Sequence, residues 1–185
     1  MIDKKPLLIN LLGGPGCGKS TTAAGVFCLL KLHGIDCELI TEFAKDLVWE
    51  ERQKTFKNQQ YIFAKQHHRI WRVIDSVDVV ITDSPLILSL VYGQKYNTID
   101  EPFYNNVISL INKYNNLNII LKRNKKYNAN GRNQTKEEAE EIDNDIKNTL
   151  LKYNISWIEA PGNLDGINKI TELTLKEELK FKITK

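Results

Sequence analysis

Cysteines are few in this chain of 185 residues, and the three present are Cys17, Cys28 and Cys37. Their number is odd, and their spacing matches neither a zinc site nor a disulfide framework. We therefore expect free thiols in a reducing compartment, which indicates a cytoplasmic protein.

Long apolar runs are also missing. No stretch approaches the roughly 18 residues that a transmembrane helix needs, and residues 1–6 lack the apolar middle of a signal peptide. Charge is nearly balanced, with a net value of +3, which is too small to argue for nucleic acid binding by itself. We expect no membrane partner.

The remaining composition, 42% hydrophobic and 26% charged residues, is that of a globular domain. The length suits one domain over residues 1–185 with its own core. No repeat, linker or second domain is visible in the sequence.

The glycine-rich stretch from Gly13 to Ser20, followed by Thr21, is the most informative part of the chain. Its sequence GGPGCGKS matches the phosphate-binding loop G-x-x-x-x-G-K-S. An apolar run over residues 7–12 precedes it and a helical pattern over residues 21–33 follows it. This strand-loop-helix context predicts a nucleoside triphosphate site, or P-loop.

The residue types of the P-loop suit a triphosphate. Glycines let successive N–H groups turn toward one anion, and the following helix directs its N-terminus at the same place. Lys19 is expected to reach the β- and γ-phosphates, and the Ser20 hydroxyl to bind Mg²⁺. The backbone amides of residues 14–20 are the other expected donors. The predicted nucleotide-binding residues are Gly14, Pro15, Gly16, Cys17, Gly18, Lys19, Ser20 and Thr21. We expect ATP, since no guanine-reading motif is apparent.

Strand-like runs alternate with helical patterns along the whole chain. This alternation predicts an α/β fold, the three-layer P-loop NTPase fold, with a five-stranded parallel sheet covered by helices on both faces. The expected strands are residues 7–12, 36–41, 78–82, 117–121 and 155–159. The expected helices include residues 21–33, 43–51, 56–77 and 86–92, one capped by Asp100, one begun by the Thr135 capping box, and one after Gly162.

Two acidic residues directly follow predicted strands, Glu42 after the second and Asp83 after the third. Ligands of open α/β sheets bind at the carboxyl ends of the strands, so both side chains should face the P-loop. Asp83 is predicted to hold Mg²⁺ directly or through water. Glu42 has two open interpretations, a functional carboxylate or a first-turn residue that favours the helix dipole. Ser84 and Pro85 are predicted to begin the next helix.

Gln60 and His67 lie on the apolar stripe of the helix predicted over residues 56–77. Such residues are usually core or boundary groups. The alternative is that Gln60, or its neighbour Gln59, binds an acceptor molecule through its amide. His68 is expected to face solvent.

A basic, asparagine-rich stretch follows the fourth predicted strand, over about residues 122–134. Its composition and its position at a strand's carboxyl end favour a flexible lid over a solvated loop. Arg123 and Arg132 are its predicted catalytic residues, because a guanidinium neutralises charge that spreads over a transferring phosphoryl group.

Together these motifs resemble the small P-loop kinases of nucleosides and nucleotides. They are most similar to the nicotinamide riboside kinase-like group, which includes many bacteriophage proteins known as AAA-type ATPases. The resemblance rests on the P-loop, residues 41–46 (TEFAKD), residues 81–85 (ITDSP) and the lid. It implies that Glu42 takes a proton from an acceptor hydroxyl, and a phage-encoded protein would act in the host cytoplasm. Deoxynucleoside and thymidylate kinases carry an arginine where Ser84 stands, so the chain departs from those two families.

We therefore predict an ATP-dependent phosphotransferase that moves the γ-phosphate of Mg-ATP to a hydroxyl or phosphate of a nucleoside- or nucleotide-like acceptor. Its predicted catalytic residues are Lys19, Glu42, Asp83, Arg123 and Arg132, with Ser20 and Asp83 on the metal. Two alternatives stay open: a kinase whose acceptor lies in DNA or RNA, such as a 5′ end or a hydroxymethylated base, and a P-loop ATPase switch with a protein partner. A homo-oligomer is compatible with the sequence, and no pattern names the acceptor.

Overall fold

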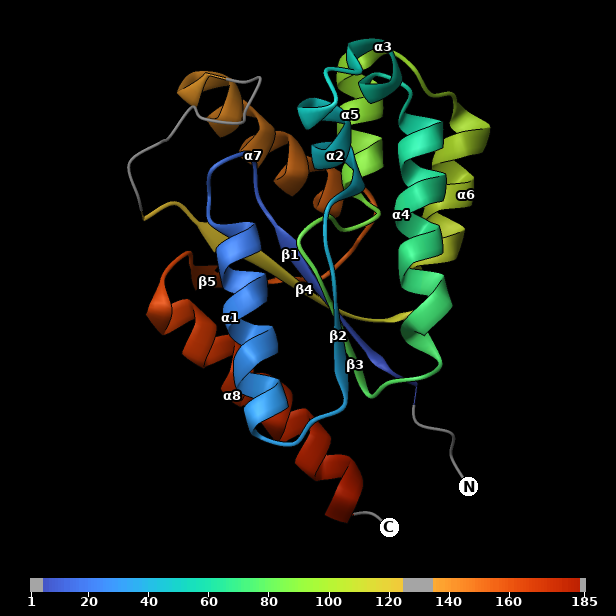
Figure 1. Ribbon diagram of the computed structural model, residues 1–185. Helices are drawn as coiled ribbons and strands as arrows, with labels where there is room; N and C mark the ends of the chain where they lie inside the picture. The colour runs from blue at the N-terminus through green and yellow to red at the C-terminus, as the bar shows by residue number, and fades with distance from the viewer. Residues whose placement is uncertain (1–4, 125–134, 184–185) are drawn as a thin grey trace.

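A computed structural model describes residues 5–124 and 135–183 of the chain. Its five strands are β1 (Leu7–Leu12), β2 (Cys37–Ile40), β3 (Val79–Thr82), β4 (Asn115–Lys122) and β5 (Ile158–Pro161). They form one sheet in the order β2-β3-β1-β4-β5, and every neighbouring pair is parallel (Figure 1). The predicted fold class is confirmed.

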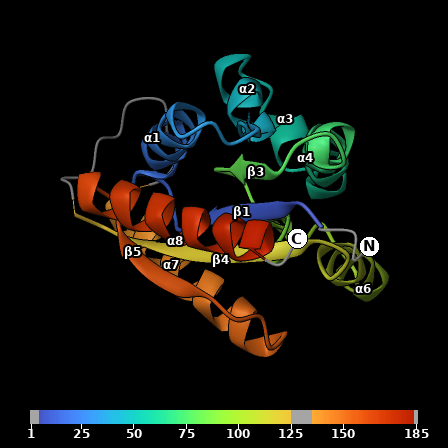
Figure 2. The same ribbon diagram turned by 90° about the horizontal axis from the view of Figure 1, so that it is seen from below.

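Helices cover both faces of this sheet. They are α1 (Lys19–Leu32), α2 (Phe43–Trp49), α3 (Gln53–Phe56), α4 (Gln59–Ile74), α5 (Leu88–Tyr96), α6 (Glu101–Ile111), α7 (Lys136–Lys152) and α8 (Leu164–Ile183). Helices α1 and α8 pack together on one face, and α4, α5, α6 and α7 cover the other. Figure 2 shows α1 on one side of the strands and α4 and α6 on the opposite side.

The central strand β1 separates two apolar cores. Leu8 and Leu12 pack toward α4 to α7, whereas Ile9 and Leu11 pack toward α1 and α8. This division follows from the alternation of side chains along a strand. β1 pairs with β3 and β4 at its edges, and helices cover both faces of the sheet, so all of its residues are buried. Its run of apolar residues reflects this burial on both faces.

A buried amide cluster interrupts the first of these cores. The Asn10 amide nitrogen donates to the side-chain oxygens of Asn116 at 2.9 Å and Asn118 at 3.0 Å. Asn118 in turn donates to the backbone oxygen of Ser156 at 3.1 Å. These bonds satisfy polar groups that would be costly to bury alone, and they join β1 to β4 in one register.

The prediction of one continuous helix over residues 56–77 is wrong in one respect, because α3 ends at Phe56 and α4 begins only at Gln59. The Asn58 side chain accepts a hydrogen bond from the Tyr61 N–H at 3.1 Å and so caps a new helix, α4. With this start, Gln60 is exposed. Gln59 is buried instead, at 3% exposure.

The two histidines of α4 lie in different surroundings. His67 is half-buried, and its Nε2 lies 2.9 Å from the Tyr114 hydroxyl. Burial lowers the pKa of His67, with His68 and Lys113 adding to this effect. His67 is therefore a boundary group, whereas His68 is exposed as expected.

Two further boundaries differ from prediction. Ser84 and Pro85 form a turn before α5, and the Ser84 N–H donates to Thr82 Oγ1 at 3.1 Å. The fifth strand begins three residues later than predicted, because the Ile155 N–H still bonds the Leu150 oxygen at the end of α7. Helix-ending bonds of this kind are hard to separate from a strand start by sequence alone.

Candidate active site

The P-loop joins β1 to α1 at the edge of the sheet where the parallel strands end. Gly16 and Gly18 have φ angles of +81° and +100°, a region that favours glycine. A Cβ added to Gly18 would lie 3.2 Å from the Gly162 oxygen, so the turn after β5 confines the loop. At Gly18 the loop therefore has little room for a side chain.

The side chains that end the P-loop lie at the start of α1. Lys19 Nζ donates to the Gly13 oxygen at 2.7 Å and the Gly14 oxygen at 3.1 Å. Ser20 and Thr21 are exposed. The first N–H groups of a helix have no intrahelical partner, and with the helix dipole they favour a bound anion.

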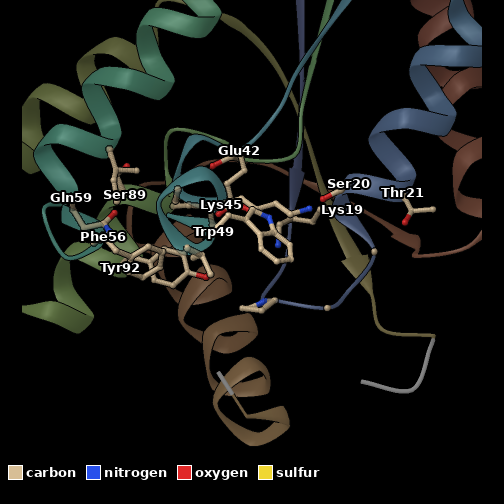
Figure 3. A pocket seen from close by; sticks show the side chains of 18 residues that line it. Lys19, Ser20, Thr21, Glu42, Lys45, Trp49, Phe56, Gln59, Ser89 and Tyr92 are labelled. Carbon is tan, nitrogen blue, oxygen red and sulfur yellow. Dashed lines mark hydrogen bonds between the residues drawn. The ribbon is translucent and has the colours of Figure 1, made fainter. Parts of the chain in front are cut away.

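A cleft of about 330 Å³ opens in front of the P-loop (Figure 3). This volume is in the range of small-molecule sites. The P-loop forms one end, and side chains of α2 to α5 form the other. The lining residues from these helices are Ala44, Lys45, Val48, Trp49, Phe56, Gln59, Ile62, Leu88, Ser89 and Tyr92.

Glu42 lines the cleft between these two ends. It is the N-cap residue of α2, yet within the described chain its side chain makes no capping hydrogen bond. Burial raises the pKa of Glu42 above its ordinary value, the nearby Asp83 raises it further, and Lys19 opposes the change. Figure 3 shows Glu42 beside Lys19. The Glu42 carboxylate is therefore free of its own helix cap and can contact a molecule bound in the cleft.

Asp83 directly follows β3, is 3% exposed and is not among the residues that line the cleft. Its Oδ1 atom has no hydrogen-bond partner among the residues that the structure describes. An unpaired buried carboxylate oxygen is costly unless a cation or a donor compensates it. Ser20 and Asp83 supply the oxygen ligands that Mg²⁺ prefers, while nucleotide phosphates and waters normally complete its shell. These residues fit a magnesium ion.

Arg123 holds the P-loop to α7. Its Nε donates to Asp143 Oδ2 at 2.6 Å, and its Nη atoms donate to the oxygens of Pro15 at 2.7 Å and Ala139 at 3.0 Å. Asp143 Oδ1 accepts from the Gly14 N–H at 2.5 Å. The Gly14 amide, expected to bind phosphate, is therefore engaged with Asp143.

Arg123 was expected in a lid, but its side chain is not among those that line the cleft. Arg132 and residues 125–134 lie outside the described residues. Asp143, like Gln66 of α4, gave no usable sequence signal. Each is a polar residue at the edge of an apolar helical stripe, a position usually occupied by solvent-facing groups.

Replacing Asp143 with asparagine tests the contact between the P-loop and α7. Asparagine keeps one oxygen that accepts, whereas its NH2 group can only donate. The bond from either Arg123 or Gly14, worth roughly 1.5–3 kcal/mol for a charged hydrogen bond, is therefore lost. We expect ATP affinity, measured by calorimetry, to fall about tenfold. The exposed Asp145 of the same helix gives the control Asp145→Asn. Equal affinities in the two variants would show that this contact does not shape the nucleotide site.

A family model described as AAA domain matches residues 8–165. The chain belongs to this AAA domain family. The matched region of the AAA domain includes the P-loop, Glu42, Asp83 and Asp143. No curated protein sequence matches the chain.

The solved structures that resemble this AAA domain include two with a bound nucleotide or nucleoside-like ligand. A deoxyadenosine kinase from M. mycoides with bound dATP has a TM-score of 0.55 and 18% identity, over 92% of this chain and 98% of that one. The NadR protein in complex with NR has a TM-score of 0.66 and 14% identity, over 93% of this chain and 51% of that one. The likeness shows a shared fold, which confirms the predicted P-loop NTPase fold and the resemblance to small P-loop kinases at that level. In the described part of the AAA domain, no helix is long and apolar enough to cross a bilayer.

Proposed function

We propose that the protein is an ATP-dependent phosphotransferase that acts on a nucleoside- or nucleotide-like acceptor. The observation that carries this proposal is the placement of Glu42. Its carboxylate lies in the cleft between the P-loop and a second, largely apolar end, without a capping bond to its own helix. A base between a phosphate site and a ligand site suits transfer to a hydroxyl.

The P-loop end would bind the triphosphate. The Lys19 ammonium, the loop amides beyond Gly14 and the N-terminus of α1 are its positive groups. Ser20 and Asp83 would hold Mg²⁺, which when bound neutralises charge on the phosphate oxygens.

The other end of the cleft would bind the acceptor. Rings of Trp49, Phe56 and Tyr92 line it, together with the buried amide of Gln59. Trp49 is 68% exposed at this end, and a large exposed ring beside a cleft favours stacking on a planar ligand. The dATP and NR of the two similar structures also support a nucleoside-like acceptor.

In the proposed reaction, Glu42 accepts the proton of the acceptor hydroxyl as that oxygen attacks the γ-phosphorus, and ADP leaves. Arg123 would contribute by keeping the P-loop in shape. Arg132 would close over the transferring phosphoryl group and exclude water, which separates transfer from hydrolysis.

The test is Mg²⁺-dependent ADP release with a panel of nucleosides, nicotinamide riboside, nucleoside monophosphates and DNA with natural or hydroxymethylated bases. Each is compared with a reaction that has no acceptor. Stimulation by a small acceptor supports the proposal and identifies the acceptor class. Stimulation by DNA alone would favour the nucleic acid alternative, and acceptor-independent hydrolysis would favour an ATPase switch.

A further inference from the structure

Gln66 is a buried residue of α4, 2% exposed, that contacts the backbone on both sides of Glu42. Its Oε1 accepts from the Phe43 N–H at 3.0 Å, and its Nε2 donates to the Thr41 oxygen at 3.4 Å. The same Nε2 donates to Thr82 Oγ1 at 3.3 Å. One amide group therefore joins the end of β2 to the end of β3.

The bond to Phe43 replaces an ordinary helix cap. Phe43 begins α2, and the N–H groups of a first helical turn have no partner within the helix. An N-cap side chain usually accepts one of these bonds, but the Glu42 side chain does not. Gln66 accepts from Phe43 instead, so α2 gains a cap from α4 while the Glu42 carboxylate stays in the cleft.

The bond to Thr82 extends this network to the second carboxylate. Thr82 directly precedes Asp83, and its Oγ1 also accepts from the Ser84 N–H at 3.1 Å. The residues on either side of Glu42 are thus hydrogen-bonded to Gln66, and Gln66 is hydrogen-bonded to Thr82, the residue before Asp83. Arg69, one turn further along α4, donates to the Thr41 oxygen at 3.0 Å and to Asp46 Oδ2 of α2 at 2.7 Å, and these two bonds hold the end of β2 and the start of α2.

We propose that Gln66 is a positioning residue, which fixes the separation between Glu42 and Asp83 during phosphoryl transfer. This inference rests on the proposed function, since it assigns Glu42 to the acceptor and Asp83 to the metal. Gln66 itself would touch neither substrate, because it is buried and does not line the cleft.

The variant Gln66→Met removes all three bonds at similar volume, and Gln60→Met makes the same change at an exposed position of the same helix. We expect kcat for acceptor phosphorylation to fall about tenfold or more in Gln66→Met, because small misplacements of catalytic groups cost about this much. The KM for ATP should change less than about twofold, since the P-loop is not touched. Rates are divided by the folded fraction from thermal unfolding, which separates positioning from lost stability.

The pH profile gives a readout that lost stability alone would not move. The charged and titratable groups around Glu42 are Lys19, Asp83, Lys45, Asp46 and Tyr92. A change in the distance from Glu42 to these groups changes the pKa of its carboxyl. We therefore expect the acid limb of the kcat profile to shift in Gln66→Met and to stay in place in Gln60→Met.

Amide hydrogen exchange tests the same contact without any activity. The Phe43 N–H should exchange at least about tenfold faster in Gln66→Met than in the wild type or in Gln60→Met, because its acceptor is lost. If the wild type phosphorylates no acceptor, the proposed function fails and the positioning role fails with it. If the Phe43 N–H exchanges at the same rate in Gln66→Met as in the wild type, the hydrogen bond between Gln66 and Phe43 is wrong. If the wild type is active and the two variants share one kcat and one pH profile, only the positioning role is overturned.

Discussion

Replacing Glu42 with glutamine is expected to lower acceptor phosphorylation by roughly 10² or more, in line with general-base contributions. Glutamine keeps the size of the side chain but cannot accept the proton of the acceptor hydroxyl. ATP affinity should change little, because the P-loop and the start of α1 remain intact. The measurements are kcat with the acceptor found by the panel and the dissociation constant of Mg-ATP by calorimetry.

Glu50→Gln is the matched control, since Glu50 is an exposed residue at the other end of the same helix and pairs with Arg52 at 3.3 Å. This variant should behave as the wild type. A comparable loss of ATP binding and of phosphorylation in Glu42→Gln would mean that Glu42 supports the fold or the metal rather than the acceptor.

The raised pKa of Glu42 predicts two pH dependences. Phosphotransfer should fall as the pH drops through the raised pKa, because a protonated carboxyl is no base. The nucleotide-free fold, in contrast, binds this proton more tightly than the unfolded chain. The resulting stability is fully present below the ordinary pKa near 4.5 and is lost as the pH rises through the folded pKa. Thermal unfolding across this window should therefore show a pH dependence that Glu42→Gln removes.

The second large effect is expected for Asp83→Asn, with turnover lowered by about 10² to 10³, the cost of removing one preorganised charge-stabilising group. A neutral amide keeps the shape of the buried side chain but is a poor ligand for Mg²⁺, which prefers charged oxygens. The Mg²⁺ concentration for half-maximal rate should rise about tenfold or more. A magnesium titration of ADP release measures both quantities, and chelation of the metal should abolish wild-type turnover.

Asp83→Asn should also lower the pKa of Glu42 in the nucleotide- and metal-free protein, which the pH dependence of thermal unfolding measures. The Asp83 charge contributes to the raised pKa of Glu42, so removing it lowers that pKa. Asp75→Asn, at an exposed residue that follows α4, is the control. An unchanged magnesium requirement in Asp83→Asn would show that this carboxylate is not a metal ligand.

Local signals made much of this site predictable. The P-loop is recognised from a short motif with a strand before it and a helix after it. Glu42 and Asp83 were found because each follows a predicted strand near its carboxyl end. The starts of two helices, α6 and α7, were equally predictable. Asp100 accepts from the Phe103 N–H at 3.2 Å, and Thr135 begins α7 with the predicted capping box.

Contacts between distant elements could not be predicted in the same way. Gln66 bonds residues 16 to 25 positions away, and Asp143 bonds Gly14 at a separation of 129 residues. No local pattern records such partners, which depend on the strand order. The sequence also contained no sign that the Arg123 side chain points toward α7 and the P-loop. Its partner Asp143 lies 20 residues further along the chain, and no local pattern connects the two.

The break before α4 was missed because hydrophobic spacing was misleading. Phe56 lies in phase with Phe63, yet Phe56 belongs to α3 and packs beside Tyr96 at a ring distance of 6.1 Å. A seven-residue interval fits a continuous helix and also fits two helices with a capped turn between them. The Asn58 cap was the available signal.

The amides of Asn10, Asn116 and Asn118 have a consequence for how this chain folds. Parallel strands far apart in sequence pair late and slowly, and apolar side chains alone distinguish poorly between alternative pairings. A misaligned β1–β4 pair would bury amides without partners, at roughly 1–3 kcal/mol for each unsatisfied group. Misfolded intermediates with this error should therefore reopen before the helices cover them, so that these three side chains reduce kinetic trapping and aggregation.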